Sequence, residues 1–68
     1  MNPIIFERSI GGIYRPLNFE HRKNFLEFLR RSGNYDRWEF HPHRLSKAGM
    51  GLAKALAKHH GYKIEVQE

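Results

Sequence analysis

The segment 44–61 constrains the fold most, because it carries both a start and a stop signal for one helix. Ser46 can accept hydrogen bonds from the first free amides, and the alanines and leucines that follow favour helix. Gly61 suits the left-handed conformation that often ends a helix. The sequence therefore predicts a helix that begins near Ser46 and ends near Gly61.

The two sides of this helix differ in character. At about 100° per residue, Leu45, Leu52 and Leu56 fall within roughly 40° of one another and predict an apolar stripe that should be buried. The opposite side carries three residues in a similarly narrow arc, which we call the lysine face: Lys47, Lys54 and Lys58.

Positive charge is concentrated in the same part of the chain. The formal net charge is +5, and no Asp or Glu occurs between Glu39 and Glu65. That interval holds five of the 12 Lys and Arg residues, which leaves seven to balance the seven acids. The five are Arg44, Lys47, Lys54, Lys58 and Lys63. A helix with this uncompensated charge predicts an anionic partner.

The length of 68 residues predicts a single domain over residues 1–68. A core of this size rarely supplies more than about 3–5 kcal/mol, so a homodimer remains open. The lack of cysteine excludes disulfides and thiolate metal sites. Apolar runs are too short for a signal peptide or a membrane span, so we expect a cytoplasmic protein. A membrane surface is disfavoured as a partner, because the apolar side of the basic helix carries no aromatic residue.

The N-terminal region predicts a hairpin, since residues 4–10 and 13–17 flank Gly11-Gly12. A two-residue loop would place three pairs on one face: Ile10 with Ile13, Phe6 with Leu17, and Arg8 with Arg15. Opposed arginines are unfavourable unless negative charge lies between them. Either both arginines reach water and pair with Glu7 or another acid, or they contact an anion together, or the register differs.

A second helix is predicted over residues 19–32, with Asn18 as its cap and Gly33 after its end. Its apolar arc comprises Phe19, Phe25, Leu26, Phe28 and Leu29. Its outer face carries both charges at i,i+3 and i,i+4 spacing: Glu20, Lys23, Glu27, Arg30 and Arg31. Because this helix is compensated internally, we interpret it as structural.

Two further strands are predicted. Residues 35–41 alternate, with Trp38 and Phe40 on one face, and Pro42 ends the strand or places it at an edge. Residues 62–66 also alternate, and the core side would carry Tyr62, Ile64 and Val66. The fold class is therefore α+β, in the order β-β-α-β-α-β. We expect a three- to four-stranded sheet with both helices packed on one face and at least one parallel strand pair.

The five histidines include two local pairs, His41 with His43 and His59 with His60. Capping and packing explain them most simply, because a protonated imidazole suits the end of a helix. A zinc or nickel site with a carboxylate such as Asp36 or Glu39, or nuclease chemistry by His41 and His43, are the alternatives. Without a nucleophile, triad or paired carboxylates, we predict no enzyme activity, no metal and no cofactor.

Glycines at positions 49 and 51 each cost a helix about 1 kcal/mol relative to alanine. Gly49 would allow close approach of the sheet and Gly51 close approach of a phosphate, or both would simply let the helix pack closely. Gly49-Met50-Gly51, with Ala55 beyond it, resembles the hairpin of helix-hairpin-helix DNA-binding motifs. Lys47 and Lys58 stand where that family has apolar residues, so we do not assign the family.

These observations favour a small nucleic-acid-binding module that contacts the phosphate backbone of DNA or RNA. The predicted contacts are Arg44, Lys47, Gly51, Lys54, Lys58 and Lys63, with Arg8 and Arg15 extending the surface. Trp38, Phe40 and Tyr35 are expected in the core, with base stacking as the alternative. The alternative function is a protein-interaction module, a small inhibitor or adaptor that docks its basic helix on an acidic protein.

Overall fold

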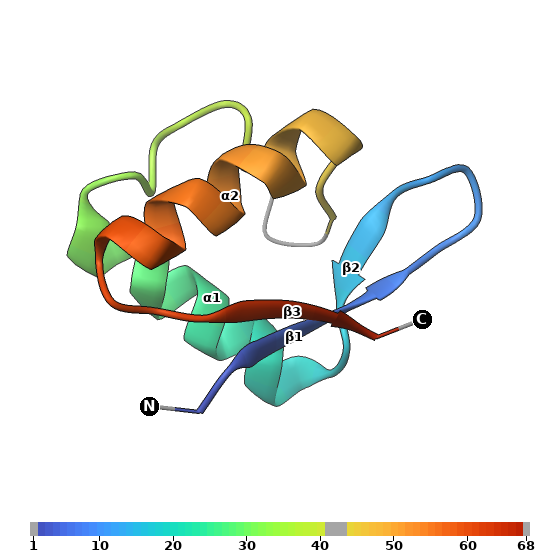
Figure 1. The fold of residues 1–68 in the computed structure, drawn as a ribbon, viewed down its shortest axis with the longest axis horizontal. Coiled ribbons are helices and arrows are strands. Elements are labelled where there is room, and N and C mark those ends of the chain that lie inside the picture. The colour runs from blue at the N-terminus through green and yellow to red at the C-terminus, as the bar shows by residue number, and fades with distance from the viewer. Residues whose placement is uncertain (1, 41–43, 68) are drawn as a thin grey trace.

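The protein is described by a computed structural model over residues 2–40 and 44–67 (Figure 1). Its elements are β1 (Ile4–Arg8), β2 (Tyr14–Pro16), α1 (Phe19–Ser32), α2 (Lys47–His59) and β3 (Ile64–Gln67). The sheet order is β2-β1-β3, with β2 antiparallel and β3 parallel to the central β1. The predicted α+β class and the parallel strand pair are confirmed.

The strand predicted over residues 35–41 is wrong for the part that the structure describes. Residues 35–40 form turns, in which the amide of Arg37 donates to the carbonyl of Asn34 and the amide of Phe40 to that of Arg37, both at 3.2 Å. Because these bonds are local, the segment needs no neighbouring strand. Over residues 2–40 and 44–67, the element order is therefore β-β-α-α-β, with three strands.

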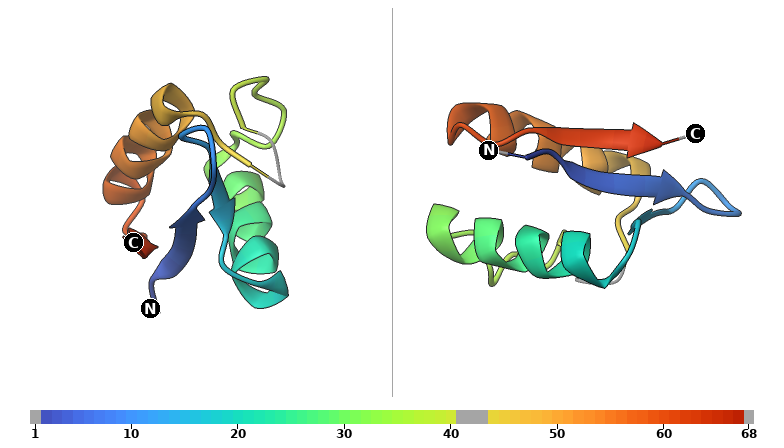
Figure 2. Two further views of the ribbon diagram at one scale, coloured as in Figure 1. Left: turned by 90° about the vertical axis from the view of Figure 1, so that its right-hand side faces the viewer. Right: turned by 90° about the horizontal axis from the view of Figure 1, so that it is seen from below.

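One core unites the sheet and both helices. In Figure 2, α2 lies on the β3 side of β1, and α1 lies on the β2 side. The buried strand residues Ile4, Phe6 and Ile64 share one face of the sheet, as its register requires. They join one cluster with buried residues of both helices and the connecting segment: Phe25, Phe28, Leu29, Phe40, Leu45, Met50, Ala53 and Ala57. Tyr62 and Val66 pack against this cluster, which confirms the predicted core side of β3.

The hairpin register differs from the prediction by one residue. Phe6 pairs with Pro16, Glu7 with Arg15 and Arg8 with Tyr14. The loop contains three residues between Ser9 and Ile13, whose backbones are joined by a hydrogen bond of 2.6 Å. Gly11 and Gly12 both have positive φ, 83° and 75°, which explains the two glycines in a loop of this kind.

This register corrects the predicted pairing of Arg8 with Arg15. A one-residue shift moves Arg15 off the face that carries Phe6 and places it opposite Glu7, 3.4 Å from its carboxylate. The same shift brings Tyr14 onto the core face. There its backbone exchanges hydrogen bonds of 2.8 and 2.7 Å with Leu45, a contact far along the chain that fixes the register.

Helix α1 follows its sequence signals closely. The side chain of Asn18 accepts a hydrogen bond from the amide of His21 at 3.1 Å, and Gly33 ends the helix with a φ of 75°. Burial of Phe25, Phe28 and Leu29 is confirmed, and Leu26 is half-buried. Phe19, which extends the predicted apolar arc, is 70% exposed, because the first residue of the helix lies beyond the core.

The first turn of α1 and Leu17, just before the helix, also complete the hydrogen bonding of β1. The amide of Ile5 donates to Nδ1 of His21 at 3.1 Å, and the carbonyl of Ile5 accepts from the amide of Leu17 at 2.9 Å. Pairing with β2 begins only at Phe6. The imidazole of His21 and the amide of Leu17 therefore satisfy the backbone groups of Ile5, which β2 does not reach.

Helix α2 begins and ends as predicted. The hydroxyl of Ser46 accepts from the amide of Gly49 at 3.1 Å, and Gly61 has a φ of 78° just beyond the helix. Gly49 and Gly51 lie within the first turns of α2, so the chain forms no hairpin between helices at this point.

The buried side of α2 is rotated from the predicted leucine stripe. Its buried residues are Gly49, Met50, Ala53 and Ala57. Leu52 and Leu56 are only half-buried, so their predicted burial is too great. Small side chains at the contact let the helix approach the core closely and leave the longer leucines at its flank. Leu45 is buried but precedes the helix.

Gly49 lies against the turn over residues 35–40 rather than against the sheet. A Cβ atom on Gly49 would lie 3.1 Å from the carbonyl oxygen of Glu39, whereas a Cβ on Gly51 would meet nothing within 4 Å.

Gly51→Ala should therefore raise the free energy of unfolding by about 1 kcal/mol. Gly49→Ala should raise the free energy of unfolding by less than Gly51→Ala does, or lower it, because the backbone carbonyl of Glu39 would have to move. Urea unfolding followed by circular dichroism measures both, and equal stabilisation would contradict this packing.

Candidate nucleic-acid interface

The lysine face is exposed along the whole of α2. Lys47, Lys54 and Lys58 all reach solvent, and no Asp or Glu occurs in the sequence between Glu39 and Glu65. Within residues 2–40 and 44–67, none of the three lysines forms an ion pair. By contrast, α1 carries an i,i+4 ion pair between Arg31 and Glu27 at 3.0 Å. The surface of α2 therefore offers positive charge that its own chain does not neutralise.

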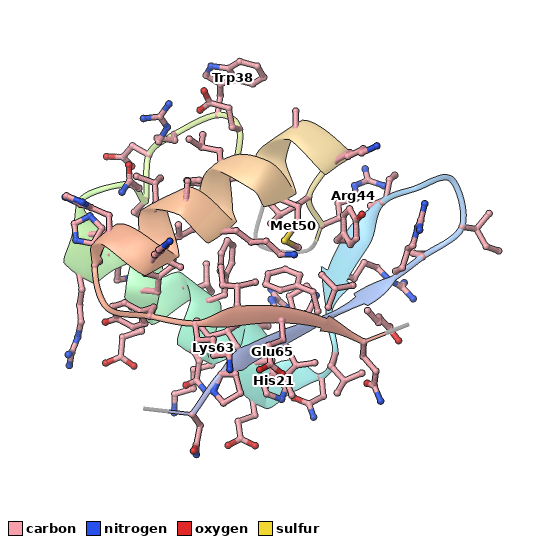
Figure 3. The ribbon with its side chains drawn as sticks, in the orientation of Figure 1. His21, Trp38, Arg44, Met50, Lys63 and Glu65 are labelled. Atoms are coloured by element: carbon pink, nitrogen blue, oxygen red, sulfur yellow. The ribbon has the colours of Figure 1, made fainter. Side chains whose placement is uncertain are left out.

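A ridge of small residues runs beside the lysine face. Ala48, Gly51 and Ala55 are exposed on α2, and a Cβ on Gly51 would have open space around it. No side chain larger than a methyl group rises from this ridge, so an extended partner can approach the helix backbone here. Arg44 is also exposed, and it lies near the N-terminal end of α2 (Figure 3).

Two of the other predicted contacts carry acidic partners and lie elsewhere. Lys63 pairs with Glu65 at 3.1 Å, and Figure 3 shows both side chains pointing away from α2. Arg15 pairs with Glu7 at 3.4 Å. The positive charge of each of these two side chains is compensated by its acidic partner, so neither belongs to the surface formed by the lysine face.

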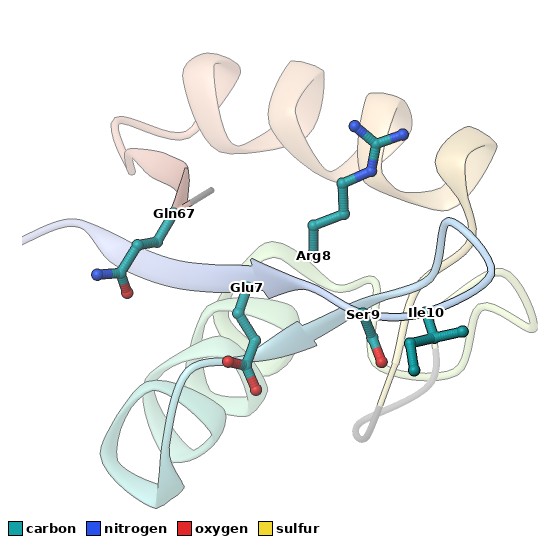
Figure 4. A pocket seen from close by; sticks show the side chains of 5 residues that line it. All are labelled: Glu7, Arg8, Ser9, Ile10 and Gln67. Atoms are coloured by element: carbon teal, nitrogen blue, oxygen red, sulfur yellow. The ribbon is translucent and has the colours of Figure 1, made fainter.

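Arg8 projects on the α2 side of the sheet, while the neighbouring Glu7 points the other way (Figure 4). Arg8, Glu7 and Gln67 line an open hollow of about 670 Å³ at the ends of β1 and β3, together with Ser9 and Ile10. The hollow lies at the ends of β1 and β3 and includes no residue of α2, so it is separate from the lysine face.

Sequence reasoning placed Trp38 in the core, but its side chain is 89% exposed. It extends from the turn over residues 35–40, beyond α2 (Figure 3). Phe40 is buried as predicted, and Tyr35 is half-exposed with the Arg30 guanidinium 5.3 Å from its ring centre. The alternation of aromatic residues therefore gave the correct side for Phe40 and the wrong one for Trp38.

A second hollow, of about 600 Å³, lies between Trp38 and the start of α2. Its lining includes the following residues: Ile13, Trp38, Arg44, Leu45, Ala48 and Leu52. Glu39 also lines it, but its carboxylate accepts two hydrogen bonds of 3.2 Å from Arg37. These bonds lower the pKa of Glu39 below the ordinary value and neutralise much of its charge. The hollow thus combines an aromatic side chain, an apolar lining and an exposed guanidinium.

The histidine alternatives gain no support from the described residues. The rings of His59 and His60 lie 5.0 Å apart at the exposed end of α2. No group of three or more His, Cys, Asp or Glu residues that could hold a metal occurs within the described ranges, 2–40 and 44–67. His41 and His43, the proposed nuclease pair, lie outside the described residues, as does Pro42.

No helix in the described part of the chain is both long and apolar enough to cross a membrane. Comparison with protein-family models, with curated proteins and with solved structures finds no match to this chain. Charge and geometry of the surface are therefore the basis for proposing a function.

Proposed function

We propose that this protein binds nucleic acid, and that the lysine face of α2 contacts the phosphate backbone. The observation that carries the proposal is the exposure of Lys47, Lys54 and Lys58 on one side of a helix without ion-pair partners among the described residues. Arg44 extends this charge at the start of α2.

The dimensions of the lysine face suit a polyanion. Lys47 and Lys58 are about three helical turns apart, which corresponds to about 16 Å. One strand of a duplex presents a phosphate about every 3.4 Å along the axis, so a length of this size accommodates several phosphates. The adjoining ridge of Ala48, Gly51 and Ala55 lets the backbone of the nucleic acid approach closely. Contacts of this type position the protein but do not read sequence.

Salt dependence tests the proposal directly. We expect micromolar binding to random duplex and single-stranded oligonucleotides at 50 mM salt, with steep loss towards 300 mM. If Arg44 and the lysine face neutralise three to four phosphates, the log–log slope for duplex should lie between about −2.7 and −3.6, at about −0.9 per phosphate. For single strands it should lie between about −2 and −3, at about −0.7 per phosphate. No detectable binding at 50 mM salt would contradict the proposal.

Docking on an acidic protein is the alternative. The half-buried Leu52 and Leu56, beside the charged residues of α2, favour it, because protein interfaces combine apolar and charged contacts. Such a complex would be specific to its partner and only moderately weakened by salt, since part of its interface is apolar. Failure of all oligonucleotides to bind would favour this alternative.

A further inference from the structure

We propose that the nucleic acid is single-stranded, and that Trp38 stacks on one of its bases at the hollow beside the start of α2. This inference rests on the proposed function and narrows it to one class of nucleic acid. It joins two features that the lysine face does not explain: an exposed tryptophan and a hollow of about 600 Å³ that Trp38 shares with Arg44.

The exposure of Trp38 requires an explanation. A tryptophan offers one of the largest apolar surfaces available to a small core, and this chain has only one. The structure buries Phe40, two residues later, and leaves Trp38 89% exposed. Exposed aromatic side chains are the surfaces on which single-strand-binding proteins stack bases.

The turn that carries Trp38 is held by three kinds of contact: with α1, with α2 and within the turn itself. Phe40 anchors it in the core, 6.1 Å from Phe25 between ring centres. Arg37 and Glu39, on either side of Trp38, are joined by two hydrogen bonds of 3.2 Å. The carbonyl of Glu39 packs against Gly49, where a side chain would meet it at 3.1 Å. Trp38 is thus presented on an anchored turn, which reduces the entropy that a stacked base would have to overcome.

The lining of the hollow fits a nucleotide. Ile13 and Leu52 provide apolar surface for the face of a base, and Trp38 provides the stacking ring. Arg44 is exposed at the same hollow and offers its guanidinium to a phosphate or to the edge of a base. The Arg37–Glu39 pair limits the repulsion that the acid would otherwise exert on a polyanion.

A path joins this hollow to the lysine face. The ridge formed by Ala48, Gly51 and Ala55 separates the two on α2, and Ala48 itself lines the hollow. A single strand can cross the ridge with its phosphates on the lysine face and turn one base towards Trp38. A duplex keeps its bases paired and stacked, so reaching Trp38 would require unstacking.

The single tryptophan makes the inference directly measurable, because all tryptophan fluorescence reports on Trp38. The wild-type protein is titrated at 50 mM salt with three probes: an oligothymidylate, an oligomer of abasic sugar-phosphates of equal length, and a random duplex. We expect the oligothymidylate to quench the fluorescence. The abasic oligomer should bind more weakly and leave the fluorescence unchanged, since it offers phosphates without bases.

Variants then separate stacking from charge, with binding followed by the anisotropy of labelled oligonucleotides. Trp38→Ala should weaken oligothymidylate binding about 5- to 150-fold, the range that loss of one stacked base implies. It should leave the abasic oligomer unaffected, and Trp38→Phe should restore most of the affinity. Phe19→Ala is the matched control, because it removes another exposed aromatic ring, 70% exposed, from the start of α1. Its affinity should match that of the wild type.

The outcomes distinguish this inference from the function on which it rests. Equal binding of the oligothymidylate and the abasic oligomer, without quenching and without an effect of Trp38→Ala, would overturn stacking and leave phosphate binding in place. Preference for the duplex would also overturn it. Failure of all three probes to bind would refute nucleic-acid binding itself, and the single-strand inference with it.

Discussion

Phe25→Ala is expected to leave most of the protein unfolded at room temperature. The Phe25 ring is fully buried and lies at the centre of the aromatic cluster, 5.1 Å from the ring centre of Phe6 and 6.1 Å from that of Phe40. Truncation of a buried phenylalanine to alanine costs about 3–5 kcal/mol. A domain of this size rarely has more than about 3–5 kcal/mol from its core, so the loss approaches its whole stability.

Thermal and urea unfolding, followed by circular dichroism, measure this effect. Phe19→Ala provides the control on the same helix, because its ring is 70% exposed and its removal should change the free energy of unfolding by no more than about 0.5 kcal/mol. A cooperative transition of Phe25→Ala close to that of the wild type would show that the aromatic cluster is not the centre of the fold.

Lys54→Glu combined with Lys58→Glu should abolish binding to oligonucleotides at 50 mM salt. Each replacement removes one positive charge and adds one negative charge, so the formal net charge falls from +5 to +1. Both side chains are exposed on α2, and the circular dichroism spectrum should remain that of the wild type. Oligonucleotide anisotropy measures the loss of binding.

A matched pair of replacements on α1 separates the lysine face from net charge. Lys23→Glu with Arg30→Glu produces the same formal charge of +1 on another exposed helix surface. We expect this variant to retain most of the binding, with a modest loss from the weaker long-range attraction. Equal loss in both variants would mean that overall charge, and not the lysine face, determines affinity.

Local chemistry predicted the helices well. Asn18 and Ser46 both cap the helices that they were expected to cap, and Gly33 and Gly61 both follow the helix ends with positive φ. These signals depend on residues within a few positions of one another, so the sequence contains all the information that they need.

The hairpin register and the buried side of α2 were not predicted, because they depend on contacts between segments that are distant in the sequence. Gly11-Gly12 is compatible with loops of two or three residues, and the backbone pairing of Tyr14 with Leu45 selects the longer one. Leu52 and Leu56 are more apolar than alanine and mark the expected buried side on a helical projection, but close packing places Ala53 and Ala57 innermost. Alternation over residues 35–40 cannot distinguish a short strand from consecutive turns with local hydrogen bonds.

In the candidate site, too, the features set by local sequence were predictable and those set by distant contacts were not. Exposure of the lysine face follows from the helical period and was predictable. An acid as the partner of Arg15 was among the expected alternatives, but the position of Arg15 directly opposite Glu7 depends on the strand register, which was not predicted. Trp38 was assigned to the core because a small domain needs large apolar residues. The charged pair that flanks it, Arg37 and Glu39, was the available signal that this segment lies at the surface.

The hydrogen bond from Ile5 to His21 has a consequence for the behaviour of the protein at high concentration. An unpaired stretch of strand backbone is a template on which a second chain can add, the first step of domain swapping and of amyloid growth. Strand β2 is too short to cover β1 along its full length, and Ile5 would present such a stretch. The imidazole of His21 and the amide of Leu17 occupy those positions instead. The first turn of α1 and the segment that leads into it thereby protect this side of β1 from self-association, where a longer strand would otherwise be needed.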